Sequence, residues 1–173
     1  MAEGVDALEF RRFMARWPTG VSVVTAREGE TNYGLTVSAF FSVSLRPPLV
    51  LVSLSTDADT TPVIQRTHRF AINLLSADQH ILSERFASTL PPKEKFRDLP
   101  FRVSAGGLPL LGDTLGRLEC EVQKEYPVAD HDLVLGEVKG IDPGEEGPPL
   151  LYFRSGYALR RGPDLLELPR PRE

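Results

Sequence analysis

The sequence contains a single cysteine, no excess of basic residues and no long apolar run. One cysteine, Cys120, cannot form an intramolecular disulfide or a multi-cysteine zinc or iron–sulfur site. The formal net charge is −4, so nucleic-acid binding is not expected. No run approaches the ~20 apolar residues that span a bilayer, and the first residues lack the pattern of a signal peptide. We therefore expect a cytoplasmic protein that does not bind membranes.

The signature motifs of several large enzyme classes are also missing. No G-x-G-x-x-G, G-x-x-x-x-G-K, H-E-x-x-H or G-x-S-x-G occurs, which argues against a Rossmann dehydrogenase, a P-loop enzyme, a zincin and an α/β-hydrolase. His68, His80 and His131 lie apart from one another and from the cysteine, so no metal site is expected. The Asp-His-Asp run at 130–132 is no catalytic triad by itself, because adjacent residues of a strand point to opposite faces.

The first half of the chain predicts a helix followed by strands. Apolar residues recur at helical spacing within residues 6–17, where Pro18 and Gly20 then end the pattern. Two β-prone stretches, Val21–Thr25 and Leu35–Val37, lie on either side of a polar turn and predict a hairpin. The apolar run Leu49–Leu54 does not alternate with polar residues, so we expect protein to cover both faces of this strand.

Two short helices are predicted by their start signals. Thr61 is suited to cap a helix whose first position is Pro62, where the missing N–H costs nothing. Ser76 and Gln79 have the spacing of a capping box, which predicts a second helix after them. The apolar face expected for this second helix consists of Ile81, Leu82 and Phe86.

Further strand patterns follow along the chain. Leu118, Cys120 and Val122 alternate with polar residues, as in a strand with one wet face. With the other strand-like runs this makes about six to eight strands and a few small helices, which favours a closed antiparallel barrel over a doubly wound sheet. The length favours one domain over 1–173, with a core at roughly 8–160 and a C-terminal arm at 161–173. The remaining strand-like runs are Phe70–Leu74, Leu133–Val138 and Leu151–Leu159.

Hydroxyl side chains gather in two stretches, one within residues 36–44 and one within 53–61. Hydroxyls and backbone N–H groups hold phosphate, particularly at a helix N-terminus such as the one expected near Thr61. Ser and Thr are also common in strands and turns that bind nothing. From composition alone both interpretations stay open.

Many short segments, in order and at sensible spacing, resemble the flavin reductase family. Members of this family are small reductase components that supply reduced flavin to two-component monooxygenases. The resemblance extends over roughly residues 8–160. The segments that carry it are Pro18–Thr25, Leu35–Val50, Phe70–Leu75, Phe86-Ala87, Lys95-Phe96, Pro109-Leu110, Leu118–Cys120, Asp130-His131 with Gly136 and Val138, Pro149–Tyr152 and Gly156-Tyr157.

The resemblance implies a mainly β fold, the six-stranded antiparallel Greek-key split β-barrel that binds FMN, with a few short flanking helices and usually a homodimeric assembly. It implies no catalytic protein residue and no metal, because hydride transfer is cofactor chemistry. The implied flavin contacts are Thr36, Val37, Ser38 and Ala39 at the ring and ribityl chain, Ser53, Leu54 and Ser55 on the other side, Ser42, Thr56 and Thr60 near the phosphate, Phe86 against the flavin or its tail, and Lys95 as a source of positive charge. The implied nicotinamide contacts are His131 and Tyr157.

The function implied by the resemblance is an NAD(P)H:flavin oxidoreductase that reduces FMN or FAD and supplies a separate monooxygenase component. Two alternatives stay open: an FMN-binding electron-transfer protein without significant NAD(P)H oxidation, and a similar barrel that binds haem or a pyridoxine phosphate. The sequence departs from the family at Ala129, where a glycine usually precedes Asp-His, and at Thr56, where many members carry a lysine near the phosphate. Arg85 is a candidate to replace that cation.

Overall fold

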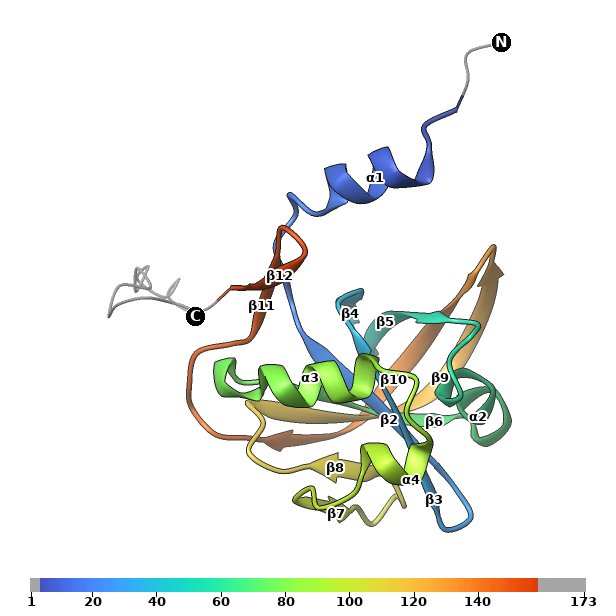
Figure 1. Ribbon diagram of the computed structural model, residues 1–173. Helices are drawn as coiled ribbons and strands as arrows, with labels where there is room; N and C mark the ends of the chain where they lie inside the picture. The colour runs from blue at the N-terminus through green and yellow to red at the C-terminus, as the bar shows by residue number, and fades with distance from the viewer. Residues whose placement is uncertain (1–3, 159–173) are drawn as a thin grey trace, which may run out of the picture.

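Seven antiparallel strands form the main sheet of the computed structural model, which describes residues 4–158 (Figure 1). The strand order is β3-β2-β6-β9-β10-β5-β4, and each neighbouring pair is antiparallel. The strands of this sheet are β2 (Ser22–Glu28), β3 (Thr31–Val37), β4 (Phe40–Leu45), β5 (Pro48–Ser55), β6 (Arg69–Leu74), β9 (Gly116–Val128) and β10 (His131–Pro143).

The predicted mainly β architecture is confirmed, but the main sheet has seven strands where the resemblance implied six. β3 stands at one end of the strand order, yet it contacts β5 near the other end. The sheet is therefore strongly curved, as expected when twisted antiparallel strands wrap around one core. The predicted hairpin is β2–β3, with Ser22 opposite Val37.

Within residues 4–158, two small sheets and five short helical segments accompany the main sheet. One small sheet has the order β1-β11-β12 and the other pairs β7 with β8. Helices α3 and α4 pack against β3 (Figure 1). The bounds are β1 (Thr19–Gly20), β7 (Phe101–Val103), β8 (Pro109–Leu111), β11 (Leu151–Phe153), β12 (Gly156–Ala158), α1 (Ala7–Met14), α2 (Thr60–Thr67), η1 (Ala77–Gln79), α3 (His80–Ala87) and α4 (Pro92–Lys95). The predicted arm at 161–173 lies outside the described residues.

The core lies inside the curve of the sheet. Its largest cluster contains Val24, Val52, Ile64, Phe70 and Val134. The predicted alternation of β9 buries the Cys120 side chain, which confirms that this thiol has a packing role. Burial, assisted by the charge of Glu119, raises the pKa of Cys120 to about 12, so the thiol is neutral and unreactive near pH 7.

The faces of β5 differ from the prediction. Val50, Val52 and Leu54 are buried in the core, whereas the residues between them are only half-buried. The expectation that protein covers both faces is wrong for a single chain. The outer face is only partly covered, so the apolar run Leu49–Leu54 contains a strand that alternates in burial but not in polarity.

The predicted N-terminal helix is confirmed as α1, and it stands apart from the main sheet (Figure 1). The Asp6 carboxylate caps it, accepting from the N–H groups of Leu8 at 2.8 Å and Glu9 at 2.9 Å. Within the described chain no residue of α1 is buried. A backbone hydrogen bond of 2.7 Å from Arg154 N–H to the Ala15 carbonyl connects the end of α1 to the β11–β12 hairpin.

The two predicted start signals have different outcomes. Helix α2 begins at Thr60, and Thr61 is its second residue, so the predicted Thr61 cap is wrong. The Thr61 hydroxyl instead donates to the Ser55 carbonyl at 2.6 Å and fastens the helix to the end of β5. The capping box of Ser76 and Gln79 is confirmed and opens η1 and α3.

The apolar face predicted for the second helix is only partly correct. Phe86 of α3 is buried and Leu82 is half-buried, but Ile81 is 63% exposed. Helix α3 presents Ser83 to the interior as well, and this serine is completely buried. Helical spacing therefore located the helix but did not identify all of the residues that face inward.

Candidate functional site

The segment that links β3 to β4 lies alongside the end of β5. The backbone N–H of Ser53 donates to the Ala39 carbonyl at 3.0 Å and fixes the segment on the strand. Ser38 and Ala39 are exposed, and within residues 4–158 their own backbone N–H groups donate to no protein acceptor. Two exposed N–H groups at fixed positions are suited to bind the acceptor atoms of a flat, polar ring edge.

The end of β5 lies beside the start of β10. His131 is the register partner of Ser55, and both the N–H and the hydroxyl of Thr56 donate to the Asp130 carbonyl at 3.1 Å. The His131 Nδ1 atom lies 2.8 Å from the Asp130 carboxylate, and this hydrogen bond lowers the pKa of Asp130. The predicted nicotinamide residue His131 therefore lies next to the predicted flavin residues Ser55 and Thr56.

A partly buried cation, Lys95 of α4, lies between β3 and α3. The Lys95 ammonium donates to the carbonyls of Gly34 at 3.4 Å and Phe86 at 3.2 Å. Burial lowers the pKa of Lys95, and the nearby carboxylate of Asp59 opposes that shift. Asp59 directly precedes Thr60, the first residue of α2. Lys95 therefore supplies positive charge between β3 and α3, and the carboxylate of Asp59 favours its charged form.

A third group of predicted residues meets at α3. The Thr36 hydroxyl donates to the Ser83 carbonyl at 2.7 Å. The Tyr157 hydroxyl donates to the Ser83 hydroxyl oxygen at 2.9 Å. A predicted flavin residue of β3 and a predicted nicotinamide residue of β12 thus share one helical residue that the sequence interpretation missed.

Four of the predicted flavin residues have buried side chains. The Phe86 ring is 1% exposed and packs edge-to-face on Phe96, with centroids 5.1 Å apart. It also fills the space above Gly34, where an added Cβ would lie 2.5 Å from the ring. This placement leaves Phe86 no face on which a bound ring could stack. The four buried residues are Val37, Leu54, Thr60 and Phe86.

Two other candidates lie outside this group. Ser42 of β4 pairs with Val50, six residues before Thr56, which separates them by about 20 Å at a strand rise of ~3.3 Å. Within one chain Ser42 therefore does not share a phosphate site with Thr56. The Arg85 guanidinium donates to the Arg97 carbonyl at 2.9 Å, so it is directed toward the segment after α4.

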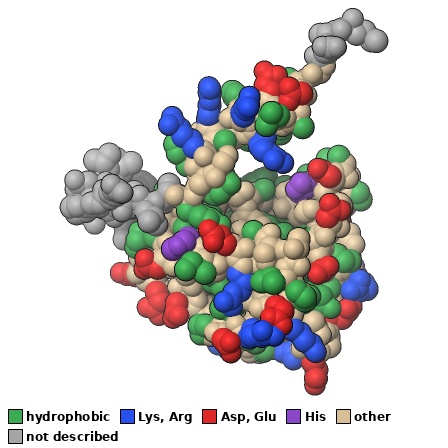
Figure 2. Space-filling model, in the orientation of Figure 1, with side chains coloured by type: hydrophobic (Ala, Val, Ile, Leu, Met, Phe, Trp, Pro, Cys, Tyr) green, Lys and Arg blue, Asp and Glu red, His purple; other side chains and the backbone are tan. Residues whose placement is uncertain are grey.

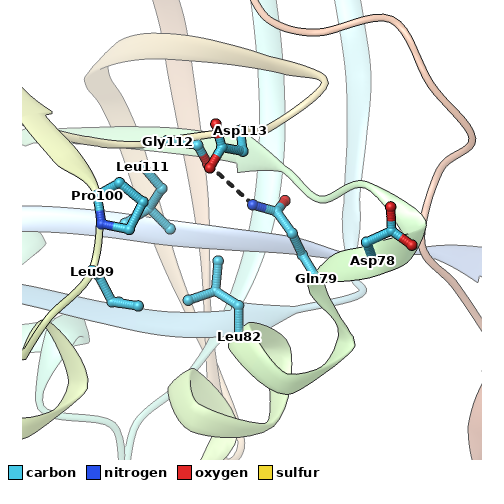
Figure 3. A pocket seen from close by; sticks show the side chains of 8 residues that line it. All are labelled: Asp78, Gln79, Leu82, Leu99, Pro100, Leu111, Gly112 and Asp113. Atoms are coloured by element: carbon cyan, nitrogen blue, oxygen red, sulfur yellow. Dashed lines mark hydrogen bonds between the residues drawn. The ribbon is translucent and has the colours of Figure 1, made fainter.

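The structure also contains a cavity of about 190 Å³ that none of the predicted site residues line (Figure 3). Gln79 closes one side by donating to the Gly112 carbonyl at 3.0 Å (Figure 3). The cavity lies between η1, α3 and the end of β8 and is mostly apolar. Its lining residues are Asp78, Gln79, Leu82, Leu99, Pro100, Leu111, Gly112 and Asp113.

The arrangement restricts the chemistry that the protein itself can perform. Across residues 4–158 no three His, Cys, Asp or Glu side chains gather as metal ligands. None of the helices in that same range is long and apolar enough to cross a membrane. The site offers backbone N–H groups, hydroxyls, an imidazole and one ammonium group. Such groups bind and orient a planar cofactor with a phosphate, and the cofactor then supplies the redox chemistry.

Comparison with known proteins agrees with this architecture and donor set. The model of the flavin reductase like domain matches residues 14–159. The reductase component of 4-hydroxyphenylacetate 3-monooxygenase from Thermus thermophilus is 40% identical over 148 residues, which cover 86% of this chain and 93% of the relative. FMN reductase (NADH) SmoA from Agrobacterium fabrum is 38% identical over 158 residues, covering 91% and 87% of the two chains.

A solved structure shows the same fold. The NADH:FAD oxidoreductase SgcE6 of Streptomyces globisporus, in complex with NAD and FAD fragments, superposes with a TM-score of 0.85 and is 32% identical. The match covers 95% of this chain and 99% of that one. The chain therefore belongs to the flavin reductase like domain family.

Proposed function

We propose that this protein is an NAD(P)H:flavin oxidoreductase that reduces FMN, or FAD, and passes the reduced flavin to a separate monooxygenase component. The observation that carries this proposal is the exposed N–H pair of Ser38 and Ala39 beside the end of β5, in a chain of the flavin reductase family. The names of its relatives, an NADH-dependent FMN reductase and a monooxygenase reductase component, support both the reaction and the partner.

The residues around the Ser38–Ala39 segment and the end of β5 fit a flavin. Ser38 and Ala39 provide N–H donors for the ring edge, and the half-buried hydroxyls of Ser53 and Ser55 line β5 beside them. Thr36 and the backbone of Val37 belong to the same side of the site. Leu54 contributes its backbone, because its side chain lies in the core. We propose that Phe86 supports the site indirectly, by packing against Phe96 and Gly34.

Bound flavin supplies the chemistry, which is acceptance of a hydride from the nicotinamide ring. The protein residues bind the two ring systems, orient them and exclude water from between them. The N–H groups of Ser38 and Ala39 are placed to stabilise negative charge that develops at a ring edge during reduction. No general base is required, which agrees with a site built from neutral hydroxyls and backbone donors.

The proposed activity is tested by following the 340 nm absorbance of NADH, and separately of NADPH, with added FMN or FAD in air. We expect rapid loss of absorbance that depends on flavin and identifies the preferred pair of cofactors. Tightly bound flavin with no loss of absorbance would favour the electron-transfer protein instead. Absence of both flavin binding and oxidation would show that this chain shares only the fold of its family.

We propose that Lys95 interacts with the flavin phosphate. Thr56, where many family members have lysine, brings a hydroxyl but no charge, and Arg85 is directed elsewhere. Two of the three Lys95 donors reach carbonyls, which leaves one donor for an anion near Thr60 and the start of α2. Asp59 lowers the net positive charge around Lys95, so we expect a moderate affinity for the flavin phosphate.

Replacement of Lys95 by Gln is expected to weaken FMN binding about tenfold and riboflavin binding less than twofold, because a charge-assisted hydrogen bond is worth ~1.5–3 kcal/mol. Flavin fluorescence titration measures both affinities. The matched control is Lys93→Gln, which removes an exposed lysine from the same helix. Equal losses of affinity for FMN and riboflavin would show that Lys95 does not interact with the phosphate.

We propose that His131 positions the nicotinamide. His131→Ala should raise the KM for the nicotinamide about threefold to tenfold, while the flavin Kd changes less than threefold, because the imidazole contacts only one of the two ligands. Steady-state kinetics and flavin titration check this. His68→Asn is the control, since His68 is exposed at the far end of α2 and asparagine tolerates its left-handed conformation. An unchanged KM in the His131 variant would contradict the assignment.

We propose that the protein is a homodimer. An isolated helix as short as α1 is marginal in water, so its exposed apolar side chains need a partner. In Figure 2, basic side chains also gather on α1, and a hollow lies between this helix and the rest of the chain. A second exposed apolar strip lies on β4, at the edge of the main sheet. These exposed residues are Leu8, Phe10, Phe13, Met14 and Trp17 around α1, and Phe41, Val43 and Leu45 on β4.

Sedimentation equilibrium should give twice the 19.2 kDa chain mass, because both apolar strips become buried between two copies. The double variant Phe10→Glu/Phe13→Glu should sediment as a monomer, whereas Arg12→Glu on the same helix should remain dimeric or weaken only slightly. A wild-type monomer at micromolar concentration would contradict the proposal.

We also propose a cytoplasmic location. It is supported by the single cysteine, a buried free thiol, and by the proposed cosubstrates, NAD(P)H and free flavin, which belong to the cell interior.

A further inference from the structure

The β11–β12 hairpin carries Tyr157 and is fastened to the rest of the chain mainly by backbone bonds. β11 pairs with β1, and the Arg154 N–H donates to Ala15. Among residues 4–158, the bond from the Tyr157 hydroxyl to the Ser83 Oγ atom is the one side-chain hydrogen bond between this hairpin and another element. The Tyr157 ring also packs on the apolar cluster beside α3, and the bond to Ser83 fixes where its hydroxyl lies against that helix.

Ser83 is buried completely and uses two different atoms to hold two parts of the site. Its side-chain oxygen accepts from Tyr157 at 2.9 Å, and its backbone carbonyl accepts from the Thr36 hydroxyl at 2.7 Å. A buried hydroxyl that loses its partner is costly, so the bond between Ser83 and Tyr157 should persist in the folded protein. Ser83 thus links the flavin side of the site on β3 to the nicotinamide side on β12.

We infer that Ser83 is a positioning residue for flavin reduction: its hydroxyl fixes Tyr157 against the nicotinamide while its carbonyl holds Thr36 at the flavin. This inference rests on the proposed function, with Thr36 on the flavin side of the site, and on the nicotinamide contact that the family resemblance implies for Tyr157. Ser83 touches neither ligand and acts through these two residues. The two links are separable, because replacing the side chain leaves the carbonyl in place.

The test uses Ser83→Ala, Tyr157→Phe and the double variant in the full-length protein. The control for the serine is Ser88→Ala, which removes a hydroxyl that bonds Arg85 and Leu90 at the C-terminal end of the same helix. The control for the tyrosine is Tyr152→Phe, the cross-strand neighbour of Tyr157. Each variant is assayed for the nicotinamide KM, kcat, the Kd of oxidised flavin and the melting temperature.

Ser83→Ala and Tyr157→Phe should each raise the nicotinamide KM about threefold to tenfold, the effect of one lost hydrogen bond. The double variant should be no worse than the more affected single variant, because both changes break the same bond. The flavin Kd should stay within twofold, since the carbonyl of Ser83 still holds Thr36. A merely structural serine would lower the melting temperature without this selective change in KM.

A raised KM in Tyr157→Phe with a normal KM in Ser83→Ala would overturn the inference and leave the proposed function intact. Additive effects in the double variant would also overturn it, since the two residues would then act independently. Normal nicotinamide KM values in both single variants would overturn the inference and show that Tyr157 does not contact the nicotinamide. If Ser83→Ala does not fold, Tyr157→Phe still tests the same bond. The phenylalanine ring can keep the packing of the half-buried tyrosine ring. A wild-type protein without flavin-dependent NAD(P)H oxidation would instead overturn the proposed function.

Discussion

The hydrogen bond from the Ser53 N–H to the Ala39 carbonyl is the constraint on which the site depends. It fastens the link between β3 and β4 onto β5 and thereby fixes the outward direction of the exposed segment 38–39. The bond extends the β4–β5 ladder by one position beyond the pair of Phe40 and Val52, and the curvature of the sheet brings β3 into contact with β5 as well. The core residues on the inner face of β5 stabilise that curvature, and the half-buried outer face remains available for binding.

The same arrangement explains why few reactive side chains are needed. The cofactor performs the redox step, so the protein needs fixed donors, modest positive charge and exclusion of water. Backbone N–H groups meet the first need without any particular side chain at 38 or 39. In the proposed function, Lys95 meets the second need while Asp59 moderates its charge, which suits a flavin that is passed on after reduction. Hydrogen bonds of Tyr157 and Thr36 to one buried serine would, in the inference drawn above, hold the residues proposed for the two ligands in a fixed relation.

Local patterns predicted much of the fold but not the arrangement of the site. The capping box at Ser76, the β2–β3 hairpin and the burial of Cys120 follow from spacing within a few residues, and all three are confirmed. The Thr61 cap failed because the Ser55 carbonyl, brought close by the fold, competes for its hydroxyl. Strand register separates Ser42 from Thr56, and no short sequence pattern specifies register. Ser83 was missed because a lone serine on a helix carries no motif, although its place one turn before Phe86 marked the inward face.

The most direct test of the central claim is a crystal structure of the protein with oxidised FMN. The isoalloxazine edge should accept hydrogen bonds from the N–H groups of Ser38 and Ala39, with Ser53 and Ser55 beside the ring and His131 next to its open face. Flavin bound instead in the cavity between Leu82 and Leu111, or at any place where those two N–H groups still face solvent, would contradict the claim.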